Sequence, residues 1–84
     1  MMDKLIDGLY DIYYKEAEFK WLDLTITSYC NEYGWFIKVI SMSGVEKHYE
    51  CLGAYENDYV KDLRGASPVE MSECIVSDYV FAGL

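Results

Sequence analysis

The strongest constraint on the fold is a succession of three strand patterns that are separated only by short turns. Residues 19–29 alternate apolar and polar side chains, which is the period-2 pattern of a half-buried strand. Residues 35–42 are apolar on both faces, which indicates a central strand covered on two sides. Residues 46–52 indicate a shorter strand nearer an edge, and turns at Gly34 and Gly44 separate the three. Because connections this short link antiparallel neighbours, we expect a three-stranded antiparallel meander.

Helical patterns flank the expected sheet. Residues 3–16 repeat apolar side chains at helical spacing, although Gly8 lowers helix stability by about 1 kcal/mol relative to Ala. Residues 56–64 have the pattern of a short helix, with Gly65 placed to end it. The segment Ser67-Pro68-Val69-Glu70 combines a capping box with proline at the first helical position, so a further helix begins there.

The end of this last helix is ambiguous in the sequence. Residues 74–81 fit a helix face, yet they are rich in the β-branched and aromatic residues that favour strands. We expect a short helix followed by extended chain, with a fourth strand as the alternative. The fold class is therefore α+β: an N-terminal helix, a three-stranded antiparallel sheet and one or two C-terminal helices, with the helices packed on one face.

The length of 84 residues predicts a single domain spanning residues 1–84, and no internal repeat or linker divides it. A hydrophobic fraction of 52% supplies a core and excludes a disordered tail. The N-terminal residues lack the basic and apolar regions of a signal peptide, so we expect a cytoplasmic protein.

The formal net charge is −8, from 15 acidic and 7 basic residues. Phosphate backbones and anionic membranes both attract basic surfaces, so we expect neither direct nucleic-acid binding nor membrane binding. The charge favours a basic protein partner, such as a nuclease or another nucleic-acid-binding protein. The alternative is that net negative charge only keeps a small protein soluble.

Residues able to carry chemistry are few. His48 and Cys51 form an HxxC pair, but a zinc site built with Cys30 and Cys74 would lack a second close pair of ligands. Strand alternation also places His48 and Cys51 on opposite faces, which disfavours a thiol enzyme. We expect buried free thiols, no metal, no cofactor, no catalytic residue and hence no enzyme activity.

Acidic side chains form rows at helical spacing. Asp3, Asp7 and Asp11, here called the acid row, lie four residues apart, which is a rise of about 6 Å on a helix. Two phosphate steps along a DNA strand span about 7 Å, so such a row can imitate a phosphate track. Further rows are residues 56–62 and the pair Glu70 and Glu73. The alternative is that these acids are solvated helix faces that complement the helix dipole.

The nine tyrosines are too many for a small core, and tyrosine is enriched in interface hot spots. Exposed tyrosine beside acids suits a surface rich in Arg or Lys, although the same rings could line a homodimer interface. The candidate partner-binding residues combine both types: Asp3, Asp7, Tyr10, Asp11, Tyr14, Tyr29, Glu32, Tyr33, Tyr55, Glu56, Asp58 and Asp62.

In size, charge, tyrosine content and element order the chain resembles the phage-encoded anti-CRISPR inhibitors, a resemblance that includes no shared residue motif. It implies a nucleic-acid mimic that inhibits a CRISPR effector by competing for the Arg/Lys surface that reads the PAM or holds the heteroduplex. Two alternatives stay open. One is an immunity protein or antitoxin that neutralises a basic nuclease toxin. The other is a homo-oligomeric accessory protein without mimicry.

Overall fold

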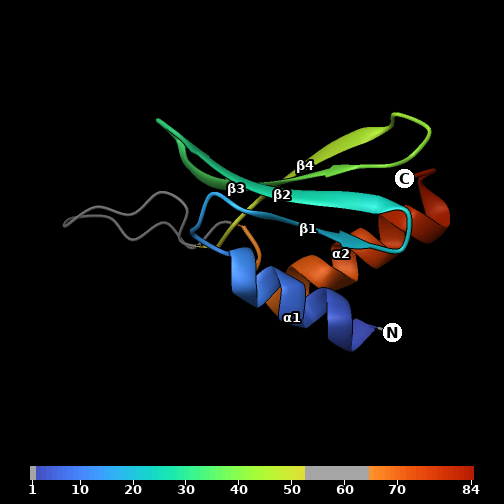
Figure 1. Ribbon diagram of the computed structural model, residues 1–84, viewed down its shortest axis with the longest axis horizontal. Coiled ribbons are helices and arrows are strands. Elements are labelled where there is room, and N and C mark those ends of the chain that lie inside the picture. The colour runs from blue at the N-terminus through green and yellow to red at the C-terminus, as the bar shows by residue number, and fades with distance from the viewer. Residues whose placement is uncertain (1, 53–64) are drawn as a thin grey trace.

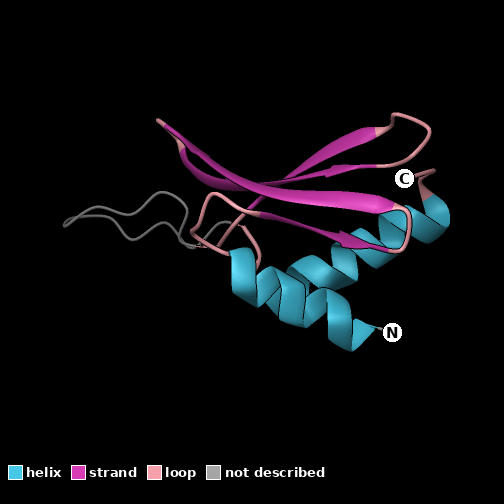
Figure 2. Cartoon of the chain, in the orientation of Figure 1, coloured by secondary structure: helices cyan, strands magenta, loops and turns pink. Residues whose placement is uncertain are grey.

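A computed structural model describes residues 2–52 and 65–84, and its fold is α+β as predicted. One antiparallel sheet contains β1 (Glu18–Trp21), β2 (Leu24–Asn31), β3 (Gly34–Ile40) and β4 (Glu46–Glu50), in that order (Figure 1). Two helices, α1 (Met2–Ile12) and α2 (Pro68–Phe81), lie together on one face of this sheet (Figure 2). We call these two helices the helix layer.

The expected strand over residues 19–29 is in fact a hairpin of two strands. Trp21 at the end of β1 pairs with Leu24 at the start of β2, so Leu22 and Asp23 form the connecting turn. Leu22 takes a left-handed φ of 55° and is about half exposed, whereas the alternation placed it inside a strand. No glycine or asparagine occupies this turn, so the usual sequence signal for positive φ is missing. The fourth strand of the sheet is therefore β1.

Helix α2 begins at the predicted capping box and continues without a break to Phe81. The expectation that residues 74–81 are extended chain or a strand is wrong. Continuing the helix buries Ile75 and packs Val76 and Tyr79 against the core, with the Tyr79 ring 6.0 Å from Trp21. This burial outweighs the weak strand preference of β-branched residues. The helix expected over residues 56–64 lies outside the described residues.

The core lies between the sheet and the helix layer. Leu5, Leu9 and Ile12 form the buried stripe of α1, spaced three and four residues apart as the helical pattern requires. The sheet and α2 complete the core with fully buried side chains: Leu24, Ile26, Ile37, Val39, Met71 and Ile75. Helix α1 ends at Ile12, four residues before the predicted boundary, and Tyr14 follows it with a left-handed φ of 60°.

The other side of the sheet, here called the open face, has neither described helix over it. It carries the residues that alternate with the core positions: Glu18, Lys20, Thr25, Thr27, Tyr29, Phe36, Lys38, Ile40, Glu46, His48 and Glu50. The prediction that residues 35–42 form a strand covered on two sides is therefore half right within the described part of the chain. Ile37 and Val39 face the helices, while Phe36 and Ile40 are half-buried on the open face.

Gly8 allows close packing between α1 and β1, a role that its low helix propensity does not indicate. The ring of Phe19 on β1 lies directly against it, and a Cβ at position 8 would come within 2.3 Å of a Phe19 ring carbon. The lack of a side chain thus lets α1 approach β1 closely. The cost of glycine in a helix, about 1 kcal/mol, is offset by this contact.

We expect Gly8→Ala to destabilise the fold by about 1 kcal/mol, because overpacking against Phe19 costs more than alanine gains in helix propensity. Urea unfolding followed by circular dichroism measures this difference. In a Phe19→Ala background the same substitution meets no ring and should stabilise the protein. Gly8→Ala with undiminished stability in the wild-type background would contradict the proposed role of Gly8.

Candidate partner-binding surface

The acid row lies on the outer side of α1. Asp3, Asp7 and Asp11 are all exposed, and at about 100° per residue they lie opposite the buried stripe of Leu5, Leu9 and Ile12. Tyr10 is on the same outer side and is 58% exposed. The amphipathic pattern of this helix therefore gathers three carboxylates and one tyrosine on a single solvent-facing surface.

Charge is divided unequally between the two layers of the fold. The helices α1 and α2 carry six acidic side chains and one lysine, whereas the four strands carry three acidic side chains and three lysines. Within the described residues, Lys47 forms an ion pair with Asp78 and His48 forms a hydrogen bond with Glu46, and neither of these pairs uses an acid of α1. The acid row is thus not neutralised by these pairs.

The acids of α2 are partly committed to structure. Asp78 faces the sheet, where it accepts a hydrogen bond from Tyr49 and lies 4.0 Å from the ammonium of Lys47. Burial and this hydrogen bond raise the pKa of Tyr49, so the phenol stays protonated and holds β4 to α2. Glu70 accepts a hydrogen bond from the Ser67 hydroxyl at 2.9 Å, and both acids of the predicted third row, Glu70 and Glu73, are exposed.

Tyr14 is about half exposed, yet its contacts are structural. Its hydroxyl donates to the carbonyl oxygen of Leu52, and its ring meets Tyr13 and Trp35 edge-on, with centroids 5.5 and 6.4 Å away. The neighbouring Tyr13 donates to the carbonyl oxygen of Ala66 at 2.7 Å, and burial raises the pKa of Tyr13. The two tyrosines thus join the end of α1 to both chain segments that flank residues 53–64.

Glu32 and Tyr33 lie in the turn between β2 and β3. Both are exposed, and the Tyr33 amide donates to the Asn31 side chain at 2.8 Å, which orders the turn. They belong to the sheet layer and not to the helix that carries the acid row. The four remaining candidates, Tyr55, Glu56, Asp58 and Asp62, lie outside the described residues.

Tyr29 lies on the open face, on the opposite side of the sheet from the acid row. Its ring stacks on Phe36 with centroids 5.6 Å apart, and its hydroxyl is 2.7 Å from Nδ1 of His48. The other nitrogen of His48, Nε2, is 2.8 Å from a carboxylate oxygen of Glu46. A carboxylate can only accept, so neutral His48 carries its proton on Nε2 and Tyr29 donates to Nδ1.

The hydrogen bonds and charges of the Tyr29–His48–Glu46 network shift the pKa values of two of its members. The hydrogen bond from His48 lowers the pKa of Glu46, whereas burial and the charge of Glu46 raise the pKa of Tyr29. A raised phenol pKa opposes use of Tyr29 as a nucleophile. The network was not foreseen, although Glu46 and His48 are two residues apart on one strand and must share a face.

The thiols do not form a site with the histidine. Cys51 is buried on the core side, where burial raises its pKa to about 11, while His48 lies on the open face. Cys30 and Cys74 are exposed, so the expectation of buried thiols holds only for Cys51. Among the described residues, no group of three or more His, Cys, Asp or Glu side chains is placed to hold a metal ion. No helix in the described ranges has the length and apolar character needed to cross a membrane.

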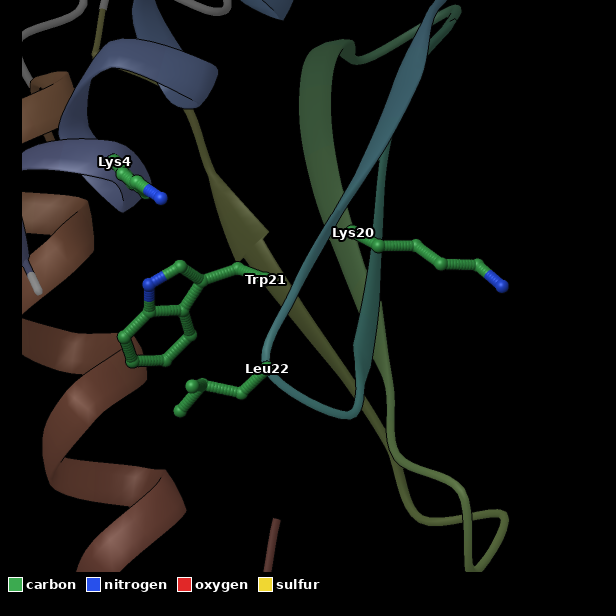
Figure 3. A pocket seen from close by; sticks show the side chains of 4 residues that line it. All are labelled: Lys4, Lys20, Trp21 and Leu22. Atoms are coloured by element: carbon green, nitrogen blue, oxygen red, sulfur yellow. The ribbon is translucent and has the colours of Figure 1, made fainter.

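A cleft at the end of β1 is lined by Lys4, Lys20, Trp21 and Leu22 (Figure 3). Trp21 and Leu22 point from the sheet toward the helices, and Lys4 projects from α1 toward the sheet, whereas Lys20 points away on the opposite side. Neither a carboxylate nor an imidazole is among these lining residues. Among the described residues, the lining of the cleft therefore brings together no pair of groups suited to acid–base catalysis.

Comparisons of this chain with protein-family models, with curated proteins and with solved structures found no match.

We expect Glu46 to titrate below the ordinary glutamate pKa of about 4.3, because His48 stabilises its charged form. Carbon-detected NMR of the side-chain carboxyl measures the midpoint. His48→Ala should return it toward the ordinary value, while Tyr29→Phe keeps the His48–Glu46 hydrogen bond and should leave it low. A lowered pKa in the folded state adds stability above about pH 4.3 that is lost as pH falls through the folded-state value. An unchanged midpoint in His48→Ala would refute the assigned hydrogen bond.

Proposed function

We propose that this protein binds a basic nucleic-acid-binding protein and inhibits it by occupying the nucleic-acid-binding surface with the outer face of α1. The supporting observation is the unequal division of charge, with six acids and one lysine on the two helices. A partner that binds phosphates presents Arg and Lys side chains, and these are complementary to such a layer.

The acid row suits this role because it is rigid and regularly spaced. The three carboxylates project from one helix whose opposite side is fully buried, so little conformational entropy is lost when a partner binds. Successive carboxylates rise by about 6 Å along the axis. Arg side chains bind carboxylates and phosphates with the same bidentate geometry, which allows one to replace the other.

Tyr10 adds an apolar and cation-binding element to the acid row. Its exposed ring lies on the same outer side of α1 as the three carboxylates, where an arginine could stack on it while pairing with an acid. Tyrosine also covers interface area at low entropic cost. We therefore assign Asp3, Asp7, Tyr10 and Asp11 as the centre of the proposed interface.

The resemblance in size, charge and element order to anti-CRISPR inhibitors makes a CRISPR effector the partner that we propose. A basic nuclease toxin would use the same complementarity, and the chain would then act as its immunity protein. Both partners would bind the same acidic surface of α1. An experiment that recovers and identifies the partner therefore distinguishes them.

The test is affinity capture from a lysate of bacteria that carry a CRISPR system, with recovered proteins identified by mass spectrometry. We expect a large basic effector to be retained at low salt, released at high salt and displaced by added duplex DNA. Neutralising the acid row with Asp3→Asn, Asp7→Asn and Asp11→Asn should weaken binding to the purified effector about tenfold or more and flatten its salt dependence.

The matched control neutralises the three acids of the strands with Glu18→Gln, Glu46→Gln and Glu50→Gln. It changes the net charge by the same amount but leaves α1 intact, so binding should weaken much less. If both triple variants weakened binding equally, the loss of affinity would depend on overall charge and not on the acid row. Capture of a nuclease toxin would identify the alternative partner, and a bound effector that DNA does not displace would contradict inhibition by occupancy.

A further inference from the structure

The open face holds apolar surface that the described helices do not cover. Tyr29 and Phe36 stand side by side on the two central strands, and Ile40 lies further along β3; all three are half-buried. A strand that is apolar on both faces is typical of a sheet covered on both sides. Since α1 and α2 lie on one side only, the apolar side chains on the other side are suited to contact with a further apolar surface.

The charges on the sheet and on the helix layer indicate which apolar surface can cover the open face. The open face mixes both signs: Lys20 and Lys38 alternate with Glu18, Glu46 and Glu50, and His48 lies among them. The helix layer, by contrast, is strongly acidic. Two copies of this chain would repel each other through their helices, but their open faces carry no such excess and can meet.

The arrangement of these charges is self-complementary in one geometry. When two sheets pack face to face about a two-fold axis parallel to the strands, β4 of one copy lies over β1 of the other. The register of the sheet then places Glu46 level with Lys20 of the other copy, and His48 level with Glu18. The central strands β2 and β3 then oppose each other and bring both aromatic pairs into the middle of the interface.

We propose that the open face binds a second copy of this chain, forming a homodimer in which two sheets stack about 10 Å apart. The face is small. β2 is about 27 Å long and four strands span about 19 Å, so the buried area lies at or below the ~800 Å² per partner of a standard interface. We therefore expect a reversible dimer that dissociates in the micromolar range. Both acid rows stay on the outside.

Sedimentation velocity on the full chain between about 1 and 500 µM tests this, because that range brackets a micromolar dissociation constant. The average mass of the wild-type protein should rise from one copy to two with concentration. Lys38→Glu replaces a positive charge on the open face with a negative one, a change of −2 per copy, and should weaken association at least tenfold. Phe36→Ser removes the stacked ring and should do the same, with folding checked by circular dichroism.

Lys4→Glu is the matched control, because it changes the net charge equally but lies on α1. It should leave the dissociation constant within about twofold. A wild-type chain that stays monomeric throughout the range would overturn the proposal, as would equal weakening by Lys4→Glu and Lys38→Glu. Binding of the basic partner through α1 should survive Lys38→Glu, so failure of the dimer and failure of the proposed function are distinguishable.

Discussion

The burial of apolar side chains on one face of the sheet is the constraint on which the remaining architecture depends. Leu5, Leu9 and Ile12 of α1 are buried in the core, and the missing side chain of Gly8 lets Phe19 of β1 pack directly against the helix. A chain of this length has little apolar material to spare. Both described helices are used on that face, and this choice fixes which side chains remain outside.

The same burial orients the charges. Once the apolar stripe of α1 faces the core, residues four apart on the other side must project together into solvent, and three of those are aspartates. Acidic side chains that face inward, such as Asp78, are instead held by Tyr49 and Lys47. The acidic surface is thus a consequence of helix geometry combined with a core that accepts only one stripe. Its use for binding a basic partner is our proposal.

Where local signals agree with burial, the sequence predicts the fold well. The capping box at Ser67 marks the start of α2, and the alternation within residues 24–29 marks β2. The sequence does not reveal the hairpin at Leu22, because positive φ at a leucine has no sequence signal. The prediction for residues 74–81 is wrong because burial of Ile75 outweighs strand propensity. For the candidate surface, helical spacing predicted correctly that the acid row lies on one exposed side of α1, while its role in binding stays a prediction. Tyr14 and Tyr29 were predicted as partner-binding residues. Their hydrogen bonds within the fold could not be predicted, because the bonded groups lie 38 and 19 residues away in the sequence.

A homodimer of a chain with net charge −8 must contend with repulsion between its two copies. In the proposed dimer the helix layers are separated by both sheets and lie about 30 Å apart, if each pair of neighbouring layers is spaced by about 10 Å. The Debye length at physiological salt is about 8 Å, so this repulsion is largely screened. Opposite charges meet only at the open faces. In this geometry the two acid rows lie far apart, on opposite sides of the dimer, and each can contact a separate basic surface. Because the two sites are linked, the dimer binds with higher avidity to any partner that offers two such surfaces.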